Sequence, residues 1–482
     1  MESTTPNVVP WRPAVRPVPI EPDPIDSDPI DMESGTHEPI EDEPGLLPSG
    51  FIEWFVVAQT AIPAMLYIPG SQAFRLPIRV GAYGITLLAF VIWWFGRGGK
   101  HNVRHPAERW LLFVLLDLVV MIFHPLTNSL LSGVAQTVLY FSIFCAVFWS
   151  SAFINRPEQL VRILAIFLVC NGINSLVGVM QVYDPDRWMP RELSFAFARN
   201  SDALAAATFV GPGGRLLVRP PGLFDTPGAV CGPGTVAALL GLIFALEQIP
   251  WWKRVVAIFF AFAGISAIYL SHVRANFVIT LGMMALYTVM LGFSGKKTKA
   301  VAFGSACVAL VSLGLTASVI VGGEGIRDRF VTLLADDPRT VYYQNRGQGL
   351  QAGFSEMLDK YPIGAGLARW GMMRTYFGNP SNLDSTELFA EVQPNAWMLD
   401  GGIPLVLLYG MALVVTIASD WKIVRNVQNP KDQAWVAAIV AANMGTIAMV
   451  FSFVPFGTQM GLQFWFLEGA LHGAMAHRLK RR

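Results

Sequence analysis

The chain has 482 residues, of which 53% are hydrophobic and 14% are charged, and it carries 35 Lys and Arg against 34 Asp and Glu. This composition is too apolar for an ordinary soluble protein, and the chain is far too long for a single membrane span. The balanced charge, with no basic face and no nucleic-acid-binding motif, argues against a nucleic-acid partner. The four cysteines lack the spacing of a disulfide framework or a zinc site. We therefore expect a polytopic membrane protein.

Residues 1–48 form an acidic, proline-rich segment. They contain eleven Asp and Glu but only two cations, Arg12 and Arg16. Such a composition cannot form a packed core, so we expect a disordered cytoplasmic tail. The segment has neither the basic start nor the cleavage site of a secretory signal, and the first span should therefore serve as an uncleaved anchor. A solvated tail and a docking tail for a cytoplasmic partner both stay open.

Apolar runs of about 17 to 23 residues recur from Phe51 onward. Each is close to the length that crosses a hydrocarbon core of ~30 Å. The run 254–293 is twice that length, and its polar residues 271–274 predict two helices joined by a tight turn. We predict an all-α membrane bundle with twelve spans, at residues 51–68, 80–96, 109–125, 132–153, 159–181, 230–248, 254–271, 274–293, 299–321, 396–419, 434–454 and 461–477.

The connections between the predicted spans alternate in charge. One alternate set carries eighteen Lys and Arg, whereas the short connections of the other set carry three, Arg75, Arg79 and Arg274. Short cytoplasmic loops are enriched in Lys and Arg, so both termini should be cytoplasmic. Two long loops, 182–229 and 322–395, then lie on the outer side. The second of them separates nine spans within residues 49–321 from three spans and a basic tail within residues 396–482.

The first outer loop ends in an arginine on a stiff turn. Arg219 is followed by two prolines and Gly222, and a second Pro-Gly pair comes just before the next span. A guanidinium held in this way can bind a phosphate through two parallel hydrogen bonds. An interfacial arginine that reaches lipid headgroups is the alternative interpretation.

Arg274 is a second candidate for anion binding. A cation in the middle of a long apolar run is costly to bury and usually faces a cavity or a partner. Its neighbour His272 is a candidate base, although a histidine near an interface is more often structural.

The long outer loop contains apolar residues at helical spacing. They predict an amphipathic helix that stops at Pro362, and they are Leu350, Phe354, Met357, Leu358 and Tyr361. Arg346 precedes them and should lie near the helix N-terminus, where free N–H groups attract anions. Gly364 and Gly366 in the following turn permit a close approach of the backbone, either to a ligand or within an ordinary turn.

The long loop ends in acidic and amide side chains. Glu387 and Glu391 are the nearest carboxylates that could act as a base on the outer side, and Gln393 and Asn395 follow them. Exposed acids on a loop are also common without any catalytic role.

The order of these features resembles the bacterial superfamily of O-antigen ligases and of O-antigen or exopolysaccharide polymerases. The resemblance covers roughly residues 51–477 and includes the number of spans and the long outer loop between spans nine and ten. It also includes three degenerate motifs, which are Arg219, Gly222 and Phe224 before span six, Ser271-x-x-Arg274 between spans seven and eight, and Arg346 with Pro362-x-Gly364-x-Gly366.

The resemblance implies an activity and a site. Members of this superfamily transfer a glycan from an undecaprenyl diphosphate carrier to an acceptor sugar on the outer face of the inner membrane, without a metal or other cofactor. Membrane lipid and the flippase and chain-length regulator of the same pathway are the implied partners. The resemblance implies that the diphosphate binds to Arg219, Arg274 and Arg346, and that the substrate-binding positions include Gly222, Gly364, Gly366, Gln393 and Asn395.

One departure from the family pattern concerns the base. Ligases of this superfamily usually have a His-Asn pair before span ten, whereas this chain has Gln393-Pro394-Asn395. A glutamine cannot take up a proton, so Glu391 becomes the candidate base, with Glu387 and His272 as alternatives, unless the acceptor needs none. The departure favours a polymerase over a ligase that transfers glycan to a lipid A-core or protein acceptor. A polysaccharide transporter or flippase is the alternative from another class, although the two halves show no repeat.

Overall fold

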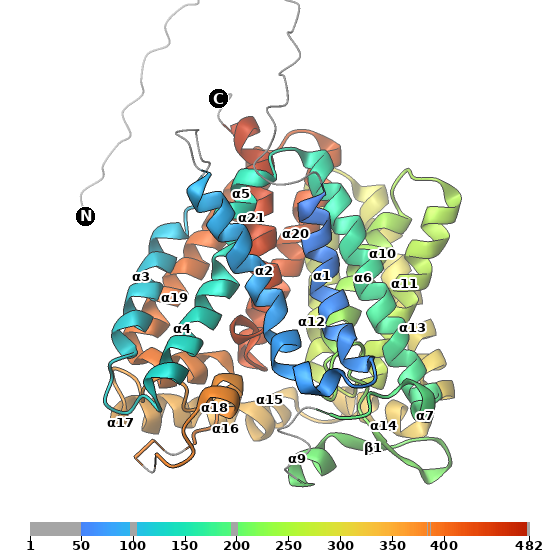
Figure 1. Ribbon diagram of the computed structural model, residues 1–482. Coiled ribbons are helices and arrows are strands. Elements are labelled where there is room, and N and C mark those ends of the chain that lie inside the picture. The colour runs from blue at the N-terminus through green and yellow to red at the C-terminus, as the bar shows by residue number, and fades with distance from the viewer. Residues whose placement is uncertain (1–49, 97–103, 194–200, 383, 386, 480–482) are drawn as a thin grey trace, which may run out of the picture. The chain divides into compact units, whose positions relative to one another are not determined.

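The computed structural model describes residues 50–96, 104–193 and 201–479, apart from residues 383 and 386. The acidic tail predicted for residues 1–48 lies outside this part of the chain. The described residues form a bundle of helices (Figure 1). Its long helices are α1 (Phe51–Ala64), α2 (Arg75–Phe95), α3 (Glu108–Met121), α4 (Leu130–Phe144), α5 (Ala146–Phe153), α6 (Pro157–Tyr183), α10 (Cys231–Ala245), α11 (Trp251–Leu270), α12 (Arg274–Phe293), α13 (Lys297–Gly322), α19 (Gln393–Asn426), α20 (Pro430–Ala448) and α21 (Gln459–Leu479).

Helical structure occupies each of the twelve predicted segments, but not every helix is long and apolar enough to be identified as a membrane span. Among the described residues, eight helical segments are long and apolar enough, namely Arg75–Phe95, Leu130–Phe153, Pro157–Tyr183, Trp251–Leu270, Arg274–Phe293, Lys297–Gly322, Gln393–Asn426 and Pro430–Phe451. Helix α3 has 14 residues, and at 1.5 Å per residue it reaches about 21 Å, short of a ~30 Å hydrocarbon core. The chain is thus a helical membrane protein, while the count of twelve spans is not confirmed.

The long helices run between two faces of the bundle. Residues 184–230, 271–273 and 323–392 connect helices at one end, at the bottom of Figure 1, and we call this end the long-loop face. Residues 154–156, 246–250, 294–296 and 427–429 connect helices at the opposite end, which we call the short-loop face. In chain order, the connections between long helices lie alternately at the two faces, as the alternation of Lys and Arg in the predicted loops requires. Which face lies outside the cell stays a prediction.

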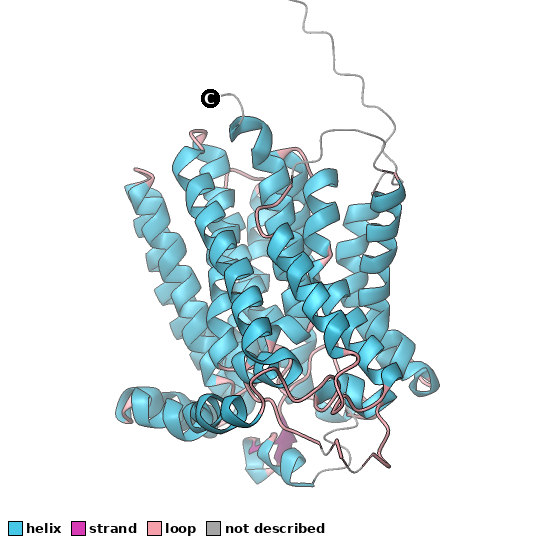
Figure 2. Ribbon diagram, turned by 90° about the vertical axis from the view of Figure 1, so that its left-hand side faces the viewer, coloured by secondary structure: helices cyan, strands magenta, loops and turns pink. Residues whose placement is uncertain are grey.

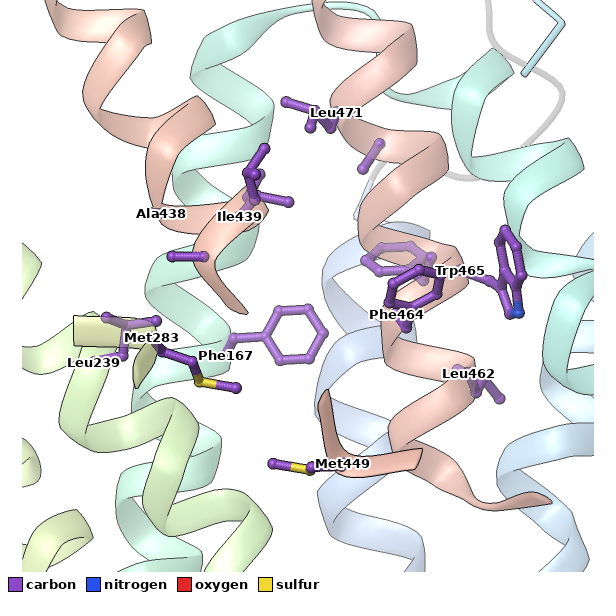
Figure 3. Close-up of a cluster of buried hydrophobic side chains, with 14 of the residues drawn as sticks. Phe167, Leu239, Met283, Ala438, Ile439, Met449, Leu462, Phe464, Trp465 and Leu471 are labelled. Carbon is purple, nitrogen blue, oxygen red and sulfur yellow. The ribbon is translucent and has the colours of Figure 1, made fainter. Parts of the chain in front are cut away.

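The core of the bundle lies where α6, α10, α12, α20 and α21 meet. Figure 3 shows buried side chains from all five helices converging there, among them Phe167, Leu239, Met283, Ile439 and Phe464. Helices α10 and α11 approach closely because glycines face each other. A Cβ on Gly264 would lie 2.6 Å from the carbonyl oxygen of Gly234, and small residues of this kind bring membrane helices together.

The long-loop face holds short elements that run across the ends of the spans (Figure 2). A β-hairpin pairs β1 (Thr208–Val210) with β2 (Leu216–Val218) in antiparallel register, with Phe209 opposite Leu217. The short helices of this face are α7 (Pro185–Trp188), α9 (Ser201–Ala206), α14 (Glu324–Ala335), α15 (Pro338–Tyr342), α16 (Gln348–Ala352), α17 (Leu358–Lys360) and α18 (Gly371–Phe377). The remaining single turns are η1 (Met65–Tyr67), η2 (Ser71–Phe74), η3 (Pro212–Gly214), η6 (Met449–Phe451) and η7 (Pro455–Gly457).

The helical segment of the long loop begins earlier than predicted. Two π-helical turns, η4 (Tyr343–Gly347) and η5 (Gly353–Met357), join α15, α16 and α17 into one run from Pro338 to Lys360. Asp337 caps this run by accepting hydrogen bonds from the backbone N–H groups of Arg339 and Thr340. An Asp followed by Pro is a strong helix start. The expected place of Arg346 at the helix N-terminus is therefore wrong, whereas the stop before Pro362 is confirmed.

The same segment exposes one residue of its apolar stripe and leaves the other four half-buried. Phe354 is 53% exposed, while Gly347 and Gly353 are buried. A Cβ on Gly353 would clash with Oδ1 of Asn395, at the start of α19. The glycine side of the segment packs on α19 because only residues without a side chain fit there.

Candidate functional site

A cavity of about 590 Å³ lies near the long-loop face. Its walls come from α1, α2, α6, the start of α10 and α12, and the residues that precede α21. Ligand sites of proteins commonly have volumes of roughly 300 to 1,000 Å³ and mostly apolar walls with a few polar groups. The polar side chains that line this cavity include Gln59, Arg79, Tyr83, Asn171, Asn174, Asp225, Asn276, Arg346, Gln459 and Gln463.

Arg219 is held at the edge of this cavity by its backbone. Its N–H donates to the carbonyl oxygen of Ala207, at 2.9 Å, and its own carbonyl oxygen accepts from the N–H of Gly228, at 3.2 Å. Gly228 lines the cavity. The guanidinium Nε of Arg219 is buried and has no hydrogen-bond partner among the described residues. The turn thus presents a fixed cation with a free donor.

Arg274 begins α12, directly after the tight turn predicted at residues 271–274. Its Nη1 donates to Oγ1 of Thr332 on α14, at 3.0 Å. The turn itself passes through His272, which has a φ of 57°, a conformation that non-glycine residues seldom adopt. The His272 ring packs against Phe209 of the hairpin, with 4.1 Å between ring centroids. Both long loops therefore meet at this turn.

His272 is an electrically neutral side chain in a cationic environment. Burial, followed by the charges of Arg329 and Arg219, lowers the pKa of His272 from 6.5 to about 3. Its Nε2 is buried without a hydrogen-bond partner in the described structure. A histidine with so low a pKa is a weak proton acceptor near neutral pH, which disfavours His272 among the alternative bases.

Arg329 joins the three arginines that the sequence analysis selected. It lies on α14, and its Nε donates to the carbonyl oxygen of His272 at 3.2 Å. Burial, then the charges of Arg219 and Arg274, lowers the pKa of Arg329. Burial, then the charge of Arg346, lowers the pKa of Arg219. Four half-buried cations are thus neighbours, and we call Arg219, Arg274, Arg329 and Arg346 the arginine cluster.

The arginine cluster has few counter-charges. Arg346 forms an ion pair with Glu391. In the part of the chain that the structure describes, no carboxylate forms an ion pair with Arg219, Arg274 or Arg329. Like charges this close disfavour one another, and an oxyanion that accepts their hydrogen bonds relieves the repulsion. The cluster therefore has the charge and the free donors to bind a polyvalent anion such as a phosphate.

The residues before and at the start of α19 divide into two groups. Glu391 reaches the arginine cluster through its pair with Arg346. Asn395 donates from Nδ2 to the carbonyl oxygen of Gly349, at 2.8 Å. Gln393 is fully buried, and its Oε1 accepts from the N–H of Phe456, at 2.8 Å. Asn395 and Gln393 thus hold neighbouring segments in place, and only Glu391 lies against the cluster.

Glu387, the other candidate base in the long loop, lies elsewhere. Its carboxylate is 3.9 Å from Nε of Arg374, and its side chain is largely exposed. The ion pair with Arg374 involves no member of the arginine cluster. Proximity therefore favours Glu391 over Glu387.

The three glycines predicted to contact substrate contact the protein itself. Gly222 has a φ of 66°, and its N–H donates to Oε1 of Gln181 on α6, at 2.9 Å. Gly364 and Gly366 have φ values of 98° and 89°. A Cβ on Gly364 would lie 3.0 Å from Gly401 in α19, and one on Gly366 would lie 2.5 Å from the N of Thr127. The close backbone approach is real, but it joins segments of the chain.

Asp225, in the first long loop, pairs with two arginines of α2, an interaction that the sequence did not predict. Asp225 accepts hydrogen bonds from Nε of Arg75 at 3.0 Å and from Nε of Arg79 at 3.2 Å. Asp225 and Arg79 both line the cavity. The sequence contains Asp225 in the turn after Arg219, but no local spacing connects it to α2, about 150 residues earlier.

Comparison with known proteins does not identify a family for this chain. The sequence matches no known family model and no curated protein. The fold and the site thus define a helical membrane protein with a cluster of four arginines near a mostly apolar cavity.

Proposed function

We propose that this protein is a membrane glycosyltransferase that polymerises glycan repeats carried on undecaprenyl diphosphate, on the outer side of a bacterial inner membrane. One observation carries the proposal. Four arginines from separate segments meet beside a cavity with mainly apolar walls, and among the described residues only Glu391 forms an ion pair with one of them, Arg346. A lipid diphosphate has the matching chemistry, because it combines a polyvalent anion with an apolar chain.

The proposed reaction is a displacement at the anomeric carbon. The acceptor hydroxyl forms a bond to this carbon, and the bond to the diphosphate oxygen breaks. The hydroxyl proton passes to the carboxylate of Glu391, and the electron pair of the broken bond leaves with the lipid diphosphate. The arginine cluster stabilises the negative charge that develops on this leaving group. Gln393 takes no part in proton transfer, since an amide cannot accept the proton at neutral pH.

The test is chain growth by the purified protein. Proteoliposomes receive lipid-linked repeats extracted from the protein's own host, and the products are separated by length. We expect a ladder of longer glycans from the wild type and none from Arg219→Ala. The control is Arg215→Ala, four residues away, whose exposed side chain pairs with Asp186 outside the cluster. A wild-type protein that leaves every repeat on its original carrier unextended would contradict the proposal.

A further inference from the structure

Trp370 forms part of the wall of the large cavity, and the reaction proposed above gives it no role. It directly precedes α18, which packs against α4 (Figure 1). Trp370 and Arg346 line the same cavity, although they lie in different segments of the long loop. The side chain of Trp370 is half-buried, so part of an aromatic ring faces the space in which the proposed ligand binds.

The indole of Trp370 is held by a buried carboxyl group. Its Nε1 donates to Oδ1 of Asp400 on α19, at 2.9 Å. Asp400 is fully buried, and its Oδ2 accepts from the hydroxyl of Tyr140 at 2.7 Å and from Nε2 of Gln136 at 3.4 Å. A buried polar network of this kind fixes the side chains that take part in it. Of these four residues only Trp370 lines the cavity, so the network sets the orientation of its ring.

The other end of the indole lies against the backbone of η7. A Cβ on Gly457 would lie 3.6 Å from Cη2 of Trp370. Gly457 also lines the cavity. Because Nε1 belongs to the five-membered ring and Cη2 to the six-membered ring, the indole is held at both of its ends. A side chain held in this way loses little conformational freedom when a ligand binds to it.

Two amide side chains of the cavity have no partner within the described protein. Asn276 on α12 is 4% exposed, and Gln463 on α21 is half-buried. Both line the cavity, and neither side chain forms a hydrogen bond with another described residue. Native structures normally satisfy the polar groups of buried side chains, so a buried amide without a partner indicates a position that a ligand or water fills. An amide both donates and accepts hydrogen bonds, which matches the hydroxyl groups of a sugar.

We propose that Trp370 stacks on a sugar ring of the glycan, and that Asn276 and Gln463 bind hydroxyl groups of the same glycan. The C–H groups on the face of a sugar ring carry partial positive charge and the face of an indole is negative, so the two attract each other. Trp370 then helps to determine which sugar is accepted, because only a ring with an apolar C–H face can lie flat on it. This inference rests on the proposed function, which supplies the lipid-linked glycan and places its diphosphate at Arg346.

Binding of the glycan without its carrier tests this role. The probe is the repeat oligosaccharide released by mild acid from the lipid-linked repeats of the protein's own host, titrated into the purified full chain in detergent. We expect Trp370→Ala to weaken oligosaccharide binding by about tenfold or more. Trp370→Phe should weaken it less, since phenylalanine keeps an aromatic face but loses the bond to Asp400. The control is Trp188→Ala in α7, on the same face but outside the cavity lining, which should bind as the wild type does.

The same titration examines the amides and the folding of each variant. Asn276→Ala should weaken oligosaccharide binding by about three- to tenfold, the usual effect of one hydrogen bond. Inorganic diphosphate should bind to the Trp370 variants with the affinity of the wild type, because its proposed ligands are the arginines. Unchanged diphosphate binding also shows that a variant is folded.

Two results would overturn the inference. One is a wild-type protein that does not bind the released oligosaccharide at millimolar concentration, and this measurement needs no variant to fold. The other is an unchanged oligosaccharide affinity in Trp370→Ala. Chain growth tests the proposed function separately. Binding that depends on Trp370 without any chain growth would contradict the glycosyl transfer alone, whereas chain growth by a protein whose Trp370→Ala variant binds the repeat normally would contradict this inference alone.

Discussion

Arg346 and Glu391 form an ion pair that connects the helical segment of the long loop to the start of α19. The pair places Glu391, the one carboxylate among the described residues that forms an ion pair with the arginine cluster, next to the cavity that Arg346 lines. Glu391 should therefore affect an anionic ligand in two ways. It competes with the ligand for Arg346, and it is positioned to accept a proton from a group that attacks beside the ligand.

Glu391→Gln should therefore change anion binding and chain growth in opposite directions. Anion binding should tighten, because Arg346 loses its counter-charge. Chain growth should fall by about 10²- to 10⁴-fold, the usual contribution of a general base. Calorimetric titration with inorganic diphosphate measures the first effect, and product length in proteoliposomes measures the second. Chain growth at the wild-type rate would remove Glu391 from the proposed reaction.

Arg329 provides a test of the cluster with a matched control on the same helix. Arg329→Ala should weaken diphosphate binding by about tenfold or more, since a charge-assisted hydrogen bond contributes roughly 1.5 to 3 kcal/mol. Arg327→Ala removes an exposed arginine of α14 that faces Glu324 at 3.9 Å, and binding should not change. Equal losses in both variants would indicate a general effect of net charge. Arg329→Lys separates charge from geometry, because lysine keeps the charge but loses the planar fork.

The lowered pKa of His272 predicts a pH-dependent stability. The unfolded chain binds a proton at His272 below about pH 6.5, whereas the folded protein does so only near pH 3. Stability is therefore fully present above pH 6.5 and is lost as the pH falls toward 3, by at most about 1.4 kcal/mol per pH unit.

His272→Asn isolates this contribution. Asparagine tolerates the left-handed backbone at this position and does not titrate. The melting temperature of the wild type in detergent should fall more between pH 6.5 and pH 4.5 than that of the variant. Parallel curves for the two proteins would show that His272 is not the group responsible, because the other histidines titrate in both.

The pairing of Asp225 with two arginines predicts a large effect on folding. The side chains of Asp225, Arg75 and Arg79 are all mostly buried. Asp225→Ala leaves the buried Arg79 without its carboxylate and Arg75 with only the exposed Glu192 at 3.7 Å, and should cost about 3 to 5 kcal/mol. Asp186→Ala removes the partner of Arg215 in an exposed pair and should cost at most about 1 kcal/mol. Thermal unfolding in detergent compares the two, and similar losses would contradict the assigned role of Asp225.

Much of the helical architecture could be predicted because it depends on local pattern. In a membrane every backbone N–H and C=O group needs a partner within the helix, so each apolar run of sufficient length predicts a helix wherever it occurs. The turn at residues 271–274 and the stop before Pro362 were found in this way. The start at Pro338 is also encoded locally, because Asp337-Pro338 is a typical helix start.

The sequence by itself determined which segments are helices, how their connections alternate and that Arg219, Arg274 and Arg346 are candidates for anion binding. Only the tertiary structure decided that Arg329 joins them, that Glu391 pairs with Arg346, and that Gly222, Gly364 and Gly366 pack against the protein itself. The physical reason is that a helix forms from interactions within one segment, whereas a site forms from side chains that helix packing brings together from segments far apart in the chain.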